Sequence, residues 1–263
     1  MKKTSGLLRL VLILTLIMGI LTVVLLFLQT ERAKNDQSIS IDPDTIKLVQ
    51  LDPPKEGDPI AIVDTTLGEF RFVLYPQYSP EAVRNFTELA ESGHYNGTYV
   101  FNSESGAYSS AGAVQKNGSL PENSDNSHEH IPRELSQDLW PFRGAVCMMN
   151  TDLERTFKEK ITGGGKYYNG SRFALINTIE FTDELKQELT DSSQVKELAD
   201  AFISLGGIPN FSQQMTVIGQ TYEGIEVVDA LSKLETENNG VYKLPVEDII
   251  INSVKIASYS VEK

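Results

Sequence analysis

Few stretches of this chain combine residue types and spacings that could do chemistry. The stretch HEH at 128–130 places two imidazoles beside a carboxylate, but a metal site needs further ligands at suitable spacing, so we interpret it as a solvated loop. The run GGGK at 163–166 is not a phosphate-binding loop, because Tyr167 follows it where Ser or Thr is required. Cys147 lies in the apolar run GAVCMM and is predicted to be buried. We therefore predict neither a metal ion nor a cofactor.

One further stretch, YNGTYVFNSESGAYSSAG at 95–112, draws attention by what it lacks. It begins like a strand, with four bulky or β-branched residues at 98–101. It then becomes a run of small and hydroxyl residues in which Glu104 is the only charge. The stretch is either a filler loop or a site from which a charged group is missing.

The elements that would position these residues are mostly strands. From Pro59 on, IAIVDTTLGEFRFVLYP predicts two strands joined by a turn near 66–68, and several more strands follow, ending with IIINSVKIASY. Helices are predicted at 80–91, with Ser79 as its cap, and at about 224–233. This order predicts a mainly antiparallel sheet or closed barrel with helices at its ends.

The beginning of the chain has a different composition. Leu10 to Leu28 contains no charged residue, and a run of this length can cross a bilayer. A cleaved signal peptide is the alternative, but its apolar part would be shorter. Because Lys2, Lys3 and Arg9 precede the run, residues 1–30 are predicted to be a cytoplasmic stub and signal anchor. The chain would pass once through the cell membrane, through residues 7–29, with its main domain outside.

Composition and net charge distinguish the parts of the chain that follow residue 30. Residues 31–58, with DPD and DPPKEGDP, are predicted to form a polar tether. The whole chain carries −13 and residues 1–30 carry +3, which leaves −16 for residues 31–263. So acidic a domain is not expected to bind nucleic acid, which requires clustered Lys and Arg. A single cysteine in an external protein favours a bacterial source.

Several motifs resemble those of cyclophilins, the peptidyl-prolyl cis-trans isomerases. After an opening with Gly68, LYP at 74–76 and Pro80, six segments follow in the order of that family: GHYNGT, IPREL, RGAVCMMN, NGSRFAL, TVIGQTYEGIEVVDAL and PVEDIIINSVKI. The resemblance implies a closed eight-stranded antiparallel barrel with two capping helices over residues 59–258. The acidic segment 182–206 resembles an inserted helix that some bacterial members carry.

The resemblance also implies where the active site would lie. Members of that family use an arginine from a Phe-His-Arg segment that follows the GxYxGT turn. Ungapped alignment from Gly97 places Asn102 at that arginine, and Gly106 and Gly112 then coincide with glycines of the family. The other substrate-groove positions implied by the resemblance are Ala107, Tyr108, Ser110, Met149, Arg172, Phe173, Ala174, Phe211 and Met215.

These replacements predict a cyclophilin-like domain whose catalysis is reduced or lost. The expected partners are proline-containing peptide segments or an exported or envelope protein, which the domain would bind as a folding factor. One alternative is an active isomerase for exported proteins, in which Arg172 substitutes for the lost guanidinium; otherwise Arg172 is an ordinary surface or ion-paired residue. A second alternative is a structural envelope module that docks through residues 182–206.

Overall fold

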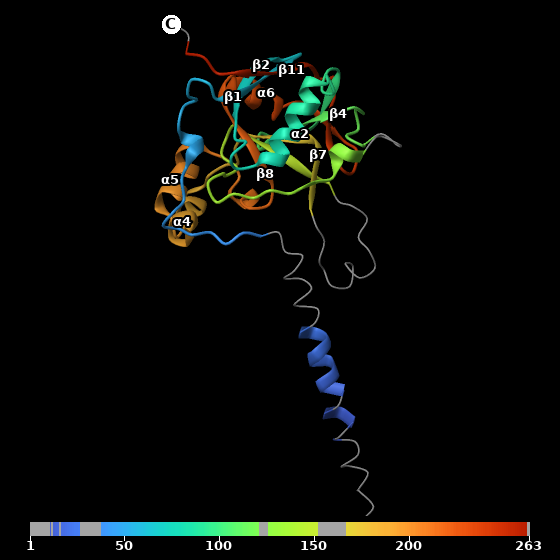
Figure 1. Cartoon of the computed structure of the whole chain (residues 1–263), viewed down its shortest axis with the longest axis vertical. Helices are drawn as coiled ribbons and strands as arrows, with labels where there is room; N and C mark the ends of the chain where they lie inside the picture. Colours follow the sequence, from blue (N-terminus) through green and yellow to red (C-terminus); the bar gives the residue numbers. More distant parts are fainter. Residues whose placement is uncertain are drawn as a thin grey trace, which may run out of the picture. The chain divides into compact units, whose positions relative to one another are not determined.

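The computed structural model describes residues 11, 13–15, 17–26, 38–120, 126–151 and 167–261. The chain divides into two units, and the larger comprises residues 38–151 and 167–263. In the larger unit nine described strands form one sheet in the order β4-β3-β11-β1-β2-β8-β6-β7-β5, and β7 also pairs with β4. The sheet therefore closes into the expected antiparallel eight-stranded barrel, with short β5 added at its edge (Figure 1). The strands are β1 (Pro59–Thr65), β2 (Gly68–Leu74), β3 (Thr98–Glu104), β4 (Tyr108–Ala113), β5 (Ile131–Pro132), β6 (Ala145–Thr151), β7 (Tyr168–Ile176), β8 (Thr216–Glu223) and β11 (Ile250–Ser258).

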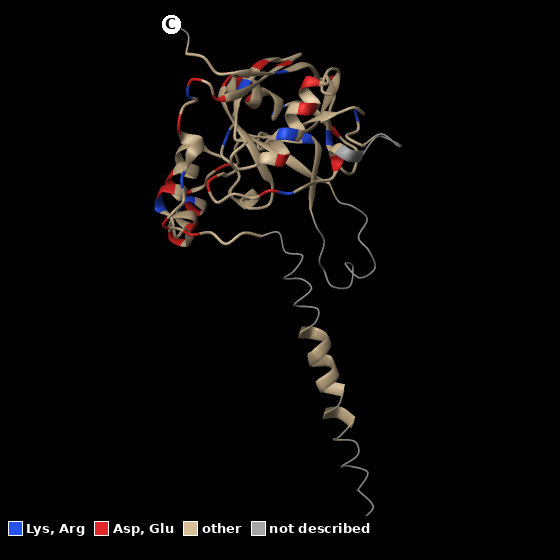
Figure 2. Ribbon diagram, viewed as in Figure 1, with Lys and Arg blue, Asp and Glu red and all other residues tan. Residues whose placement is uncertain are grey.

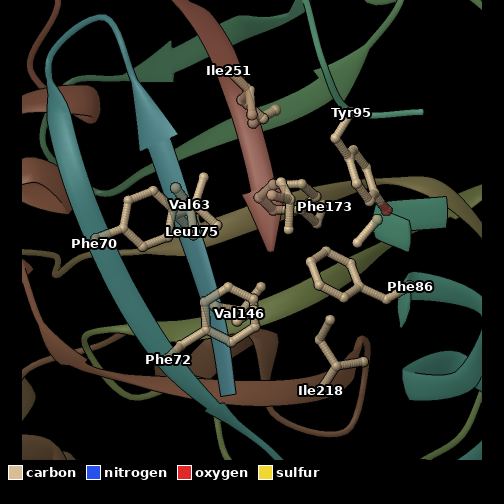
Figure 3. Packing of buried hydrophobic residues seen from close by; sticks show 14 of the residues in the cluster. Val63, Phe70, Phe72, Phe86, Tyr95, Val146, Phe173, Leu175, Ile218 and Ile251 are labelled. Carbon is tan, nitrogen blue, oxygen red and sulfur yellow. The ribbon is translucent and has the colours of Figure 1, made fainter. Parts of the chain in front are cut away.

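Alternation along these strands builds the core. In β2, Phe70, Phe72 and Leu74 point to one face, as their spacing predicts, and all three are buried. They pack inside the barrel with side chains from β1, β6, β7, β8 and β11 (Figure 3). The residues that alternate with them face outward, so they can be replaced without leaving a cavity in the core.

Two helices add their apolar sides to this core. Helix α2 (Pro80–Glu91) has the predicted bounds, and α6 (Ile225–Leu231) is slightly shorter than predicted. Ser79 takes the predicted N-cap position, but its hydroxyl makes no cap hydrogen bond and donates to the Val217 carbonyl instead. The first amides of α2 donate to the Glu134 carboxylate, which also suits the positive end of the helix dipole.

The segment 182–206 is not one helix. It forms α4 (Asp183–Ser192) and α5 (Lys196–Leu205), since Ser193–Val195 leave the helical conformation and the Ser193 hydroxyl donates to the Val195 carbonyl. Asp and Glu are spread over both helices (Figure 2). The Phe202 side chain of α5 packs against Phe142, with ring centroids 4.7 Å apart, so the pair of helices is attached to the barrel.

The polar segment 31–58 lies partly outside the described residues. Residues 38–58 run along the barrel and include a short 3-10 turn, η1 (Val49–Leu51). We call residues 38–54 the arm. The Gln50 amide of the arm is 7% exposed and donates to the Trp140 carbonyl and to Gln220 Oε1, while its Oε1 accepts from the Trp140 amide. The arm is therefore fixed to the barrel near its end.

The predicted membrane segment 7–29 also lies partly outside the described residues. Its described residues from 11 to 26 are helical, and the hydroxyls of Thr15 and Thr22 donate to carbonyls one turn earlier in that helix. Among the residues described, no helix is both long and apolar enough to span a bilayer.

Replacement of Gln50 by alanine tests the attachment of the arm. Because the change leaves the buried Trp140 amide without its partner, we expect Gln50→Ala to lower the free energy of unfolding by about 1–3 kcal/mol. Urea denaturation of the full-length chain measures this. Gln137→Ala, which removes an exposed arm contact to Asp42 and Thr45, is the matched control and should cost at most about 0.5 kcal/mol. Equal losses in the two variants would contradict the assignment.

Candidate functional site

The register of three strands brings the central predicted positions together. Asn102 of β3 is paired with Ser110 of β4, and Ser110 is paired with Ala174 of β7. These three residues are at most 2% exposed. They form a row across the seam where the barrel closes, so the alignment that assigned them from separate motifs is consistent with the geometry.

The side chain of Asn102 in this row is a neutral carboxamide that is hydrogen-bonded to the protein. Its Oδ1 accepts a hydrogen bond of 2.9 Å from the Lys243 backbone amide. Burial raises the pKa of Tyr108, nearby Glu104 raises it further, and a hydrogen bond from the Asn102 side chain acts in the opposite direction. The carboxamide oxygen of Asn102 is thus occupied by the protein backbone.

The tight turn between β3 and β4 sets this register. Ser105 and Gly106 both have positive φ, 40° and 88°, and the Ala107 amide donates back to the Glu104 carbonyl. At Gly112, with φ of 87°, a Cβ atom would lie 3.1 Å from the Tyr95 ring and 3.2 Å from the Ser171 carbonyl. Glycine at this position lets β4 approach β7 closely.

The apolar groove positions form one cluster on the outer face of the barrel. Ala174 is in its buried part, together with Cys147 and Val217. The rings of Tyr108 and Phe211 meet edge to face at 5.5 Å. The partly buried hydrophobic side chains packed on this cluster include the remaining predicted groove positions, Ala107, Met149 and Met215. We call this surface the groove.

Phe173 does not join the groove. Its side chain is fully buried in the interior core, where it packs against Phe86 and Tyr95 at 5.8 and 5.7 Å between ring centroids. Successive side chains of a strand point to opposite faces, so Phe173 and Ala174 cannot both line the same surface.

Arg172 lies on the groove face of β7, two residues before Ala174. Its Nη1 donates to the Gly118 carbonyl at 2.6 Å, whereas its Nε is buried and has no hydrogen-bond partner among the described residues. The Ser110 hydroxyl is likewise buried without a hydrogen-bond partner among the described residues. Two unpaired donors therefore flank Ala174.

Sequence reasoning missed the hairpin of β9 (Thr236–Asn238) and β10 (Lys243–Pro245) beside β3. It supplies the Lys243 amide to Asn102, and the Lys243 ammonium pairs with Glu104 at 2.6 Å. Its Tyr242 ring stacks edge to face on Phe101. The signal for it was the Asn239-Gly240 pair, a strong hairpin turn sequence.

The prediction of a solvated loop at 128–130 is wrong for its central residue. Glu129 is 5% exposed, and its Oε1 accepts from the Ser171 amide. His128 Nδ1 lies 2.6 Å from Asn85 Oδ1. Within the described residues no three metal-binding side chains are grouped. The prediction for Cys147 is confirmed: it is buried, and burial raises the pKa of its thiol.

Comparison with known proteins agrees with this geometry. Residues 60–181 match the family model described as cyclophilin type peptidyl-prolyl cis-trans isomerase/CLD. This stretch is therefore similar to cyclophilin-type isomerases. A cyclophilin-type isomerase of Cryptosporidium parvum, solved in the presence of the dipeptide Ala-Pro, superposes with a TM-score of 0.54 over 76% of this chain and 99% of its own. At 19% identity that likeness shows the fold alone.

Curated relatives include proteins of Staphylococcus and Streptococcus species. A putative peptidyl-prolyl cis-trans isomerase of Staphylococcus saprophyticus is 27% identical over 208 residues, which are 79% of this chain and 96% of that protein. One of Staphylococcus aureus is 24% identical over 77% of this chain and 93% of its own length. A putative bifunctional phosphatase/peptidyl-prolyl cis-trans isomerase of Streptococcus pyogenes is 27% identical over 80% of this chain, but the chain spans only 41% of it.

Because the space around Ala174 is filled by neighbouring side chains, a larger residue at this position should destabilise the fold. Ala174 is 1% exposed, and Tyr108 lies diagonally across the strand pair, within reach of an aromatic side chain. We expect Ala174→Phe to lower the free energy of unfolding by about 1–3 kcal/mol through overpacking. Denaturant unfolding of Ala174→Phe, Tyr108→Ala and the double variant measures it. In the double variant part of the loss should be recovered; strict additivity would show that Tyr108 does not occupy that space.

Proposed function

We propose that this cyclophilin-type domain binds proline-containing segments of other proteins and does not catalyse their isomerisation efficiently. The observation that carries the proposal is Asn102, which is neutral, buried and bonded where the family places an arginine. The fold and the apolar groove support peptide binding. The row of Asn102, Ser110 and Ala174 contains no cation, which argues against catalysis.

The reaction itself defines what is missing. Rotation about an X-Pro bond takes tens to hundreds of seconds because amide resonance must be broken. A catalyst needs a donor that acts more strongly on the twisted amide than on the planar one, together with a pocket that holds the proline ring. A cation is the stronger donor, since hydrogen bonds to charged groups are about twice as strong as neutral ones.

Neither requirement is met by the row. The oxygen of the Asn102 carboxamide is already occupied by the Lys243 amide and would have to give up that bond before it could act on a substrate. Ala174 supplies no ring for proline to pack against, and the space beside it is occupied by protein. What remains is an apolar surface containing Met149, Met215 and Phe211, and flexible methionines suit adaptable binding of peptides.

A proline-isomerisation assay tests the loss of catalysis. We expect the full-length chain not to accelerate cis-trans exchange of a tetrapeptide containing one X-Pro bond. Asn102→Arg alone should change little, because the proline ring is not held in register. Asn102→Arg with Ala174→Phe should give some activity if circular dichroism shows a folded barrel, and the two changes should be non-additive. Wild-type activity equal to that of ordinary family members would refute the proposal.

Arg172 offers the competing explanation, because its Nε has no partner among the described residues. An active isomerase using Arg172 would lose its activity in Arg172→Ala. The contrast with Asn102→Ala is diagnostic: activity that survives loss of Asn102 but not of Arg172 would assign catalysis to the neighbouring strand. We expect no activity in any of the three proteins.

The location of the domain is part of the proposal. The described residues of the N-terminal helix are apolar, and its threonine hydroxyls are bonded within the helix, as a lipid environment requires. With Lys2, Lys3 and Arg9 before it, the helix would anchor a single-pass protein of the bacterial cell membrane with the barrel outside. The segments it binds would then belong to exported or envelope proteins.

Protease added to intact protoplasts tests this orientation. The barrel should be digested, while a cytoplasmic marker protein remains whole. Complete protection of the barrel until the membrane is lysed, or a mature N-terminus found beyond Leu28, would contradict a signal anchor.

A further inference from the structure

The hairpin of β9 and β10 lies on one end of the row of Asn102, Ser110 and Ala174. The Lys243 backbone amide of β10 donates to Asn102 Oδ1 at 2.9 Å, and the Asn102 side chain is only 2% exposed. Neither strand of the hairpin belongs to the barrel sheet, because within the described residues β9 and β10 pair with each other alone. The hairpin is therefore an addition to the barrel that covers the β3 end of the candidate site.

Side chains attach the outer half of the hairpin to β3. The Tyr242 ring meets the Phe101 ring edge to face, with the centroids 4.9 Å apart. The Lys243 ammonium pairs with the Glu104 carboxylate at 2.6 Å, but both side chains are partly exposed, and such ion pairs stabilise weakly. Residues 237–241 at the tip are exposed throughout. These contacts are fewer than the hydrogen-bond ladder that holds a barrel strand, so separating the hairpin from β3 costs less than unfolding the barrel.

The hairpin keeps its own hydrogen bonds when it separates from β3. At its tip the Asn239 amide donates to the Tyr242 carbonyl at 3.1 Å. The Asn239 side-chain oxygen accepts from the amides of Val241 and Tyr242 at 3.0 and 2.8 Å. Because these bonds lie within the hairpin, it can move as one unit without losing them.

The base of the hairpin is fixed to the barrel and can act as its hinge. Just before β9 the Leu234 amide donates to the Ser103 hydroxyl of β3 at 3.2 Å. Just after β10 the Val246 amide donates to the Glu235 carbonyl at 2.9 Å, which closes the base. Pro245, the last residue of β10, is buried. A unit fixed at its base and weakly attached at its tip swings about the base.

Polar groups of the site lack partners while the hairpin is in place. The Ser110 hydroxyl and Arg172 Nε are buried and have no hydrogen-bond partner among the described residues. Arg172 is also linked to the hairpin, because its Nη1 donates to the Gly118 carbonyl, and a Cβ atom at Gly118 would lie 2.9 Å from the Tyr242 ring. Buried donors without acceptors cost free energy. An arrangement that gives these two donors an acceptor would recover that cost.

We propose that the β9–β10 hairpin is an autoinhibitory lid on the candidate site. In the closed form, which is the form of this structure, it occupies Asn102 and confines a bound segment to the apolar groove around Phe211 and Met215. In the open form it leaves β3, and the Ser110 hydroxyl and Arg172 Nε donate to carbonyls of that segment. This inference rests on the proposed binding of peptide segments to the groove. The hairpin and the segment therefore compete, and weakening the hairpin contacts tightens binding.

Hydrogen exchange tests the opening without any ligand. In the full-length chain in detergent, residue-resolved mass spectrometry compares the Lys243 amide with the Val100 amide of β3, which donates to the Ile249 carbonyl. The Lys243 amide should exchange at least about ten-fold faster, because local opening costs less than global unfolding. Tyr242→Ala should accelerate exchange at Lys243 by about another ten-fold and leave Val100 unchanged.

Two further variants make this comparison specific. Val241→Ala, which truncates a side chain that is 78% exposed, is the matched control and should change neither amide. Glu104→Gln removes the ion pair but keeps the backbone bond to Asn102, so it should accelerate exchange at Lys243 by about two-fold. Equal exchange of Lys243 and Val100 in the wild type, or equal acceleration of both by Tyr242→Ala, would make the hairpin part of the cooperative barrel and overturn the proposal.

Binding of a fluorescein-labelled peptide with one X-Pro bond tests the inhibition. By fluorescence anisotropy, Tyr242→Ala should bind the peptide more tightly than the wild type, by at most the factor found in hydrogen exchange. Val241→Ala should bind it as the wild type does. Phe211→Ala should weaken binding with and without Tyr242→Ala, since the peptide lies in the groove in both forms.

The two measurements separate the lid from the proposed function. Equal affinity of the wild type and Tyr242→Ala would overturn the lid and leave peptide binding intact. Weaker binding in Tyr242→Ala would make Tyr242 part of the binding surface, which also overturns the lid alone. If the Lys243 amide opens as expected but no variant binds the peptide at about 1 mM, the proposed function fails, and the autoinhibitory role fails with it.

Discussion

The pairing of β4 with β7 closes the sheet, and the candidate site depends on that closure. It sets Ser110 against Ala174 on the outer face while Ala111 meets Phe173 within the barrel. Because side chains alternate along each strand, one register serves two surfaces that obey different constraints. The inner surface must fill a closed space at crystal-like density. The outer surface near the seam has only to cover Ala174 and present whatever groups function requires.

Under the proposed function, this separation would allow the groove to lack a catalytic cation while the barrel stays intact. Asn102 is held by a hydrogen bond from the Lys243 backbone amide, and under the proposed function this structural bond stands in the place of a catalytic donor. The small Ala174 is accompanied by the larger Tyr108, whose ring meets Phe211. Under the proposed function these would be compensated exchanges that keep the outer cluster packed. Buried polar atoms without a partner among the described residues nevertheless remain in this region, at Arg172 Nε, the Ser109 and Ser110 hydroxyls, the Tyr75 hydroxyl and Gln213 Oε1.

The sequence predicted those features that depend on residues close to one another in the chain. The helix at 80–91 has proline at its first position and glycine just after its end, and its bounds were correct. The closed antiparallel barrel was implied by the order of the motifs that resemble cyclophilins. Contacts between distant residues could not be predicted in this way. The Lys243 amide reaches Asn102 across 141 positions, and Glu129 is buried because it accepts from Ser171 in another strand. The segment 182–206 keeps helical periodicity throughout, so the periodicity did not show the break at Ser193–Val195.

The arm contributes to the outer surface as well as being attached to it. Gln50 bonds to the Trp140 backbone and to Gln220 of β8, and the next residues, Pro53 and Pro54, line a hollow together with Tyr222 and Tyr259. Val49 of the arm packs on the apolar cluster that forms the groove. Detaching the arm would therefore expose apolar surface beside the groove. By reciprocity of linked equilibria, any partner that binds the attached form more tightly must favour attachment of the arm by the same free energy.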